Sequence, residues 1–189
     1  KGTIAQYLFN QFALKRGLPM DKIDQKNVPA PEAVAALLRG DVDAFLLWEP
    51  WPTRALKLVP GTHKLANLAE DNISVVNWLC VGPSLISDES KLAAILRVMH
   101  EASQYINAHR EESIDIISKE LKFTREDAAY QMNNINYSMD FSKARVMHDY
   151  DSLGKFALEI GRVKKVPAAA DMIRPEFIKK LDPSLAAGW

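Results

Sequence analysis

Apolar positions at helical spacing open the chain. Ile4 and Leu8 fall on one face of a helix, and Gly17 is the residue type that ends such an element. Thr3 and Gln6 have the spacing of a capping box, in which a hydroxyl and an amide pair with free backbone N–H groups at a helix start. The pattern therefore predicts a capped helix that closes at Gly17.

The same spacing predicts most of the later helices. Pro31, at a first helical position, and Gly40, just past the end, frame a helix over residues 32–39. Ser87 is expected to cap a long amphipathic helix that carries Leu92, and Thr124 has the position of a second N-cap. A proline-containing tail over 166–189 is expected to wrap a surface. Further helices are predicted over 53–59, 111–121, 125–133 and 142 to about 163.

Near-continuous apolar runs predict strands between these helices. Residues 41–48 and 73–82 have the composition of strands that are buried on both faces of a parallel sheet. Weaker patterns suggest short strands over 23–28 and 64–68, and residues 83–87 are predicted as a turn. Strands and helices that alternate at short intervals are typical of an α/β fold, which is the fold class we predict.

The predicted α/β unit opens directly on a helix. A parallel strand needs a crossover partner, and such units are normally complete, so the first strands are expected to lie outside this chain or to come from another molecule. A sheet edge and apolar surface exposed in this way favour self-association.

The charge balance narrows the possible partners. Lysine plus arginine and aspartate plus glutamate both total 24, so the formal net charge is zero and favours neither nucleic acid nor an anionic membrane.

No apolar run approaches the roughly 18 residues of a spanning helix, and the first residues do not resemble a signal peptide. The single cysteine, Cys80, lies in an apolar run and is expected to be a buried, inert thiol.

The sequence holds no recognisable catalytic constellation. Its four histidines, His63, His100, His109 and His148, are scattered without a metal-ligand spacing. A nucleophile elbow, a phosphate-binding loop and a dinucleotide fingerprint are also absent from the sequence. We therefore predict no catalytic residue, no metal site and no cofactor, and a protein that is not an enzyme.

Two short segments have the chemistry of a ligand site. At Gly2-Thr3-Ile4 a glycine precedes a helix, so a ligand can approach the backbone, and the free N–H groups and helix dipole favour an anion. At Trp48-Glu49-Pro50-Trp51 two large aromatic side chains and a carboxylate stand at the end of a predicted buried strand, and ligands of parallel sheets sit at the carboxyl ends of strands. The simpler interpretations are that the first segment is only a helix cap and that both tryptophans pack between elements.

Three motifs together resemble a known family. Gly2-Thr3 opening a helix, the run PAPEAVAALLRGDVDA over 29–44, and Trp48-Glu49-Pro50 resemble the nitrate/sulfonate/taurine solute-binding family of ABC importers. The resemblance implies a type II periplasmic-binding-protein-like fold with two α/β lobes and a mostly helical C-terminal half. Residues 1–72 would be lobe two, and 73–189 the return to lobe one with its C-terminal helices.

The resemblance also implies a function. The protein would bind a small anionic organic ligand between its lobes, alkanesulfonate or taurine in preference to nitrate, and deliver it to ABC permease subunits. It would work in the periplasm or lipid-anchored outside the cytoplasmic membrane. Under this reading Gly2, Thr3 and Ile4 hold the anionic head, Trp48 and Glu49 line the opposite side, and Pro31 and Glu32 form a second tier.

Two alternatives share the implied fold. A pyrimidine-precursor (thiamine) binding protein or synthase would require, for its enzymatic form, a histidine near the ligand motifs, and none of the four lies near them in sequence. An effector-binding domain of a regulator or sensor would be distinguished by a DNA-binding or signalling segment encoded before this chain.

Overall fold

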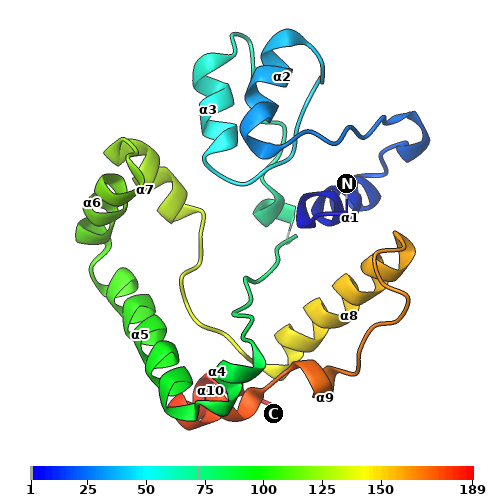
Figure 1. Cartoon of the computed structure of the whole chain (residues 1–189). Coiled ribbons are helices and arrows are strands. Elements are labelled where there is room, and N and C mark those ends of the chain that lie inside the picture. Colours follow the sequence, from blue (N-terminus) through cyan, green and yellow to red (C-terminus); the bar gives the residue numbers. More distant parts are fainter. Residues whose placement is uncertain (1, 72) are drawn as a thin grey trace. The chain divides into compact units, whose positions relative to one another are not determined.

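The computed structural model describes residues 2–71 and 73–189, and it divides into two compact units, Lys1–Val75 and Val76–Trp189. Figure 1 shows each unit as a set of helices joined by irregular segments. Within the described residues every regular element is an α-helix or a 3-10 helix, and none of these helices is long and apolar enough to cross a membrane. The two units meet between Val75 and Val76, and residue 72, where the sequence-based boundary was placed, lies outside the described residues.

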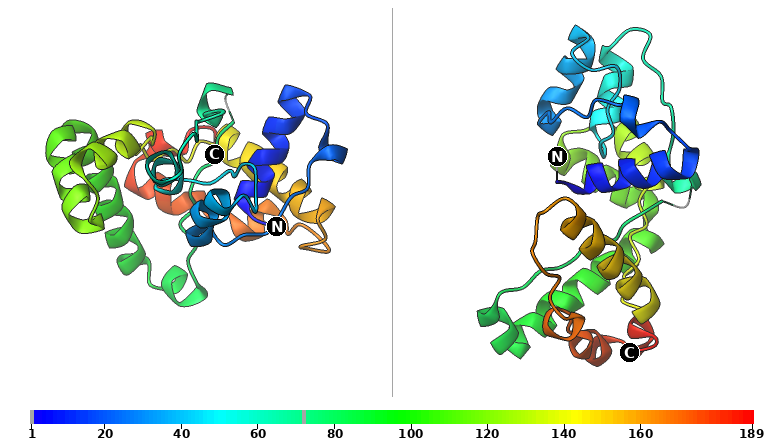
Figure 2. Two further views of the ribbon diagram at one scale, coloured as in Figure 1. Left: turned by 90° about the horizontal axis from the view of Figure 1, so that it is seen from above. Right: turned by 90° about the vertical axis from the view of Figure 1, so that its right-hand side faces the viewer.

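The predicted α/β fold with two lobes is therefore wrong for this structure. In the part of the chain that is described, no strand is present over residues 23–28, 41–48, 64–68 and 73–82. Figures 1 and 2 draw these segments as irregular trace, except at Leu68, where a 3-10 helix begins. A strand exists only through hydrogen bonds to a neighbouring strand, and these segments have no such ladder. Their burial is also incomplete, because Leu65 is 75% exposed and Leu79 is 46% exposed.

Over its described residues the first unit has three α-helices. These are α1 (Ile4–Arg16), α2 (Ala33–Arg39) and α3 (Trp51–Leu58), accompanied by the 3-10 turns η1 (Met20–Lys22), η2 (Ala30–Glu32) and η3 (Leu68–Asp71). Gly17 and Gly40 end α1 and α2 in the left-handed conformation, as the sequence predicted. Helices α2 and α3 pack against each other, with Ala36 and Ala55 buried. The predicted helices of this unit are thus confirmed.

A buried carboxylate in η3 binds the C-terminal end of α1. Asp71, in η3, is 8% exposed, and its side chain forms a two-point ion pair with Arg16 at 2.9 and 3.0 Å. Lys15 donates to the backbone carbonyl of the same residue. Because an arginine that meets both carboxylate oxygens fixes orientation as well as distance, this contact holds η3 against the C-terminal end of α1.

The second unit holds seven α-helices among its described residues. They are α4 (Pro83–Ser87), α5 (Glu89–Ala108), α6 (Arg110–Leu121), α7 (Arg125–Asn133), α8 (Lys143–Glu159), α9 (Ala169–Met172) and α10 (Pro175–Leu181), followed by η4 (Pro183–Ala186). The helices predicted after residue 87 are confirmed. The tail is more regular than expected, because α9, α10 and η4 all fall within it.

Local details correct three expectations in this unit. Residues 83–87 form α4 and not a turn, and the N-cap of α5 is Asp88, whose carboxylate accepts from the backbone N–H of Lys91 at 3.0 Å. Cys80 is exposed and not buried, because the segment around it is not the interior strand that was predicted. The N-cap at Thr124 is confirmed, since its hydroxyl accepts from the backbone N–H of Asp127 at 3.1 Å.

Two apolar clusters hold the second unit together. One lies where α5, α10 and η4 meet and contains Leu92, Leu96 and Ile178. The other lies between α6 and α7 and contains Ile114 and Met132, with Ala128 beside them. These helices bury one apolar face each, which is the arrangement that amphipathic helices favour.

The chain that follows α8 turns back along that helix, as Figure 2 shows from two further sides. The hydroxyl of Tyr150 donates to the carbonyl of Pro167 at 2.9 Å. Inside α8, Gly154 faces Val166, and a Cβ atom at this glycine would lie 3.0 Å from the valine Cγ1. The glycine therefore allows close contact between the helix and the returning segment.

This contact predicts that one substitution changes stability in opposite directions in two backgrounds. Alanine in place of glycine inside a helix normally adds about 0.5–1 kcal/mol of stability. We expect Gly154→Ala to destabilise the wild-type protein, because the new methyl group meets Val166, and to stabilise a Val166→Ala background. Urea unfolding of the four variants measures both effects. An equal gain in the two backgrounds would contradict the close contact.

Candidate ligand-binding site

The start of α1 has a conformation that suits glycine. Gly2 adopts a φ of 73°, in the left-handed region that other residues rarely enter. Its N–H donates to Oε1 of Gln6 at 2.6 Å, while the Thr3 hydroxyl makes no capping hydrogen bond. The predicted capping box is therefore only half formed. The Gln6 side chain accepts a backbone N–H, but from Gly2 and not from Thr3 as that motif requires.

Among the described residues, this arrangement leaves backbone donors at the N-terminus of α1 without a hydrogen bond to a capping side chain, other than that of Gly2. The first bond of the helix runs from the N–H of Tyr7 to the carbonyl of Thr3 at 3.2 Å, so the N–H groups of Ile4, Ala5 and Gln6 have no partner within the helix. The Thr3 side chain is exposed, and no acidic residue lies in the first turn. Free donors, an unused hydroxyl and the positive end of the helix dipole together form an environment that favours an anion.

The second predicted segment lies directly before α3. Trp48 is 55% exposed, so it does not pack as a core residue between elements. Glu49 is half-buried, and its Oε2 accepts from the backbone N–H of Thr53 at 3.2 Å, which satisfies a free donor of α3. The peptide bond between Glu49 and Pro50 is cis. In this structure Glu49 is thus a helix-capping residue, and Trp48 offers an open indole face.

The two second-tier residues lie at the surface. Pro31 and Glu32 belong to η2, which leads directly into α2, and both side chains are exposed. They are positioned by the backbone bond from the Glu32 N–H to the Pro29 carbonyl at 2.9 Å. Their place at the start of a helix agrees with the sequence pattern, while a contact with a ligand stays a prediction.

All seven predicted site residues fall within the first unit. Their hydrogen bonds are local: Gly2 bonds within the first turn of α1, and Glu49 bonds within the first turn of α3. Two neighbours were not found from the sequence, namely Gln6 as the partner of Gly2, and Arg54, whose guanidinium lies 5.1 Å from the Trp51 ring centre. The i, i+3 spacing of Trp51 and Arg54 on a predicted helix could have indicated the second contact.

Comparison with known proteins places the chain in a family. Residues 2–120 match the NMT1-like family, and because this match covers most of the chain, the protein belongs to that family. A relative from Escherichia coli strain K12 is named "Putative aliphatic sulfonates-binding protein" and is 26% identical over 119 residues. That alignment covers 63% of this chain and 37% of the relative, so the chain spans well under half of the relative's length. No solved structure matches this chain.

The family match bears directly on the sequence-based resemblance. The three motifs that suggested a solute-binding family lie inside the matched residues 2–120. The recognition of the chain as a member of the NMT1-like group with a distant sulfonate-binding relative is thus confirmed.

Proposed function

We propose that this chain is the ligand-binding part of a solute receptor for an ABC importer and not an enzyme. Its ligand is a small organic anion of the alkanesulfonate or taurine type, which an ABC permease in the membrane then receives. The receptor works on the outer side of the cytoplasmic membrane. The support for this proposal is the family membership, the printed name of the relative and the chemistry at the start of α1.

The observation that carries the proposal is the set of unused donors at residues 3–6. A sulfonate has three oxygen acceptors and one negative charge, and the first turn of α1 offers backbone N–H groups and the Thr3 hydroxyl. An exposed indole at Trp48 supplies an apolar surface for a short carbon tail. Gly2, Thr3 and Ile4 therefore hold the head group in the proposal, and Trp48 lies against the tail with Glu49, Pro31 and Glu32 around it.

A thermal-shift experiment tests this proposal. The chain and the full-length product of its gene are each heated with ethanesulfonate, taurine, nitrate and a hydroxymethylpyrimidine. A ligand present at about 100 times its dissociation constant adds about 2.7 kcal/mol to the stability of a competent receptor. We expect stabilisation by the sulfonates, and weaker stabilisation by nitrate. A shift with the pyrimidine alone would move the proposal to that ligand, and no shift in either protein would reject the receptor.

Thr3→Val tests the proposed hydrogen bond from the Thr3 hydroxyl to the ligand in the same assay. The Thr3 hydroxyl makes no capping bond, so its loss leaves the stability of the free protein nearly unchanged. A hydrogen bond to a charged group contributes about 1.5–3 kcal/mol, so sulfonate affinity is expected to fall by about tenfold or more. Thr62→Val is the matched control in the same unit. An equal loss in the control would show that the hydroxyl at position 3 does not contact the ligand.

A further inference from the structure

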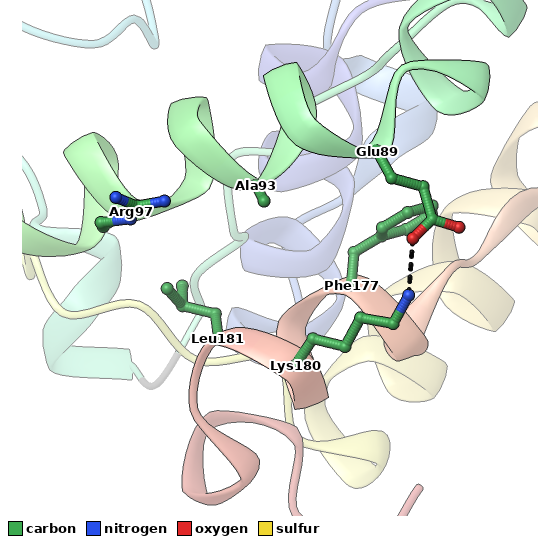
Figure 3. Close-up of a pocket in the computed structure, with 6 residues that line it drawn as sticks. All are labelled: Glu89, Ala93, Arg97, Phe177, Lys180 and Leu181. Atoms are coloured by element: carbon green, nitrogen blue, oxygen red, sulfur yellow. Dashed lines mark hydrogen bonds and ion pairs between the residues drawn. The ribbon is translucent and has the colours of Figure 1, made fainter.

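A shallow groove lies between α5 and α10 in the second unit (Figure 3). Its volume is about 370 Å³. Three lining residues follow one another at four-residue spacing along α5, so they form a single stripe on that helix. The groove is lined by Glu89, Ala93 and Arg97 from α5, and by Phe177, Lys180 and Leu181 from α10.

The centre of this groove is apolar. Ala93 is small and exposed, so the α5 wall is hollow at that position. Phe177 and Leu181 are half-buried and pack on the core cluster that contains Leu92 and Ile178. The floor is therefore held by the core of the unit, and the exposed parts of Phe177 and Leu181 make it apolar.

The ends of the groove carry charge. At one end Lys180 pairs with Glu89 at 2.7 Å, and both side chains are 64% exposed. Such exposed pairs contribute little, about 0–1 kcal/mol, so this pair separates easily. Arg97 lies at the other end, and it forms no ion pair within residues 2–71 and 73–189. The lining thus has one positive charge more than it has negative charges.

The acidic residue that follows α10 forms hydrogen bonds within its own turn. Asp182 directly follows α10, and its Oδ1 accepts from the N–H and the hydroxyl of Ser184 at 2.8 and 2.7 Å. These hydrogen bonds lower the pKa of the Asp182 carboxyl. The carboxylate is thereby committed to the turn that begins η4, and it does not belong to the lining of the groove.

We propose that this groove is the docking surface for an acidic amphipathic helix of a partner protein, with an apolar side chain over Ala93 and a carboxylate on Arg97. Ala93 and Arg97 are one turn apart on α5, and side chains at this spacing have Cβ atoms about 5–6 Å apart. A partner helix with a leucine and a glutamate four residues apart has the same spacing. An amphipathic helix that lies in a groove between two helices is a recurring mode of recognition, and arginine binds carboxylates through two parallel hydrogen bonds.

A defined peptide tests the docking surface. The probe is a fluorescein-labelled, alanine-based helical peptide with one leucine and one glutamate four residues apart, and its binding is measured by fluorescence anisotropy. The wild-type chain is expected to bind it saturably, and Arg97→Glu to weaken binding by about tenfold or more, because attraction becomes repulsion. A second peptide with lysine in place of glutamate is expected to bind Arg97→Glu better than wild type.

Lys91→Glu is the matched control for this experiment. It makes the same change of charge on α5, but Lys91 does not line the groove. Its affinity for the acidic peptide is expected to stay within about twofold of wild type. Circular dichroism confirms that both variants fold. An equal loss in the control, failure of the charge exchange, or absence of saturable binding to wild type overturns the proposal. Binding to phosphatidylglycerol vesicles without peptide binding also overturns it, in favour of a lipid surface.

Discussion

Met132→Ala is expected to lower the free energy of unfolding of the second unit by about 2–5 kcal/mol. Met132 lies on α7 and is fully buried, one of the two largest side chains with almost no exposure. It fills the space between α6 and α7 together with Ile114 and Ala128. Truncation removes buried methylene and thioether groups and leaves a cavity, and both effects reduce stability.

The measurement is urea unfolding followed by circular dichroism, with hydrogen exchange in α6 and α7 to assign the transition to this unit. Met172→Ala is the matched control, because Met172 is 61% exposed on the short helix α9. A change of less than about 0.5 kcal/mol is expected there, as for most surface substitutions. If the two variants were equally stable, the cluster between α6 and α7 would not be the core of this part of the unit.

The helices could be predicted from the sequence because their signals are local. Gly17 and Gly40 mark two helix ends with a residue type that tolerates positive φ, and the structure has both in that conformation. Thr124 supplies an N-cap within three residues of its partner. Each of these features needs only the neighbouring chain, so the periodicity and the caps are sufficient to place the element.

The strands could not be placed in the same way. An apolar run such as residues 41–48 is compatible with a buried strand, but periodicity alone does not supply the neighbour to which a strand must bond. In the structure Phe45 and Leu47 are only half-buried within an irregular segment. The α/β prediction failed because it depended on pairing between distant segments, which no short pattern contains.

The two candidate surfaces differ in whether the sequence could predict them, and the reason is the same. The residues at the start of α1 were predicted because Gly2 and Thr3 are adjacent and their chemistry depends on a helix end. The groove could not be predicted, because Arg97 and Lys180 lie on helices far apart in the sequence and only the packing of α5 on α10 brings them to one surface. The side-chain hydrogen bonds in the first turn of α1 could be assigned only from the structure, since Gln6 bonds to Gly2 and not to the expected cap residue Thr3.

Residues 76–82 form an irregular segment at the start of the second unit, and a buried side chain of α8 holds its first residue. Asp149, on α8, is 4% exposed, and its Oδ2 accepts from the backbone N–H of Val76 at 3.2 Å. The same oxygen lies 3.6 Å from Nε of Arg145, one turn earlier on α8. A segment without a strand partner must satisfy its buried backbone donors elsewhere, and here a buried carboxylate supplies an acceptor.

Asp149→Ala is therefore expected to lower the stability of the second unit by about 1.5–3 kcal/mol, the range for a hydrogen bond to a charged group. The cause is the loss of the acceptor for Val76 together with the loss of the negative charge beside Arg145. Asp151→Ala, an exposed aspartate on the same helix, is the matched control and is expected to change little. Urea unfolding gives the energies, and hydrogen exchange at the Val76 amide is expected to accelerate in the first variant only. Equal stability and equal exchange in the two variants would show that α8 does not anchor this segment.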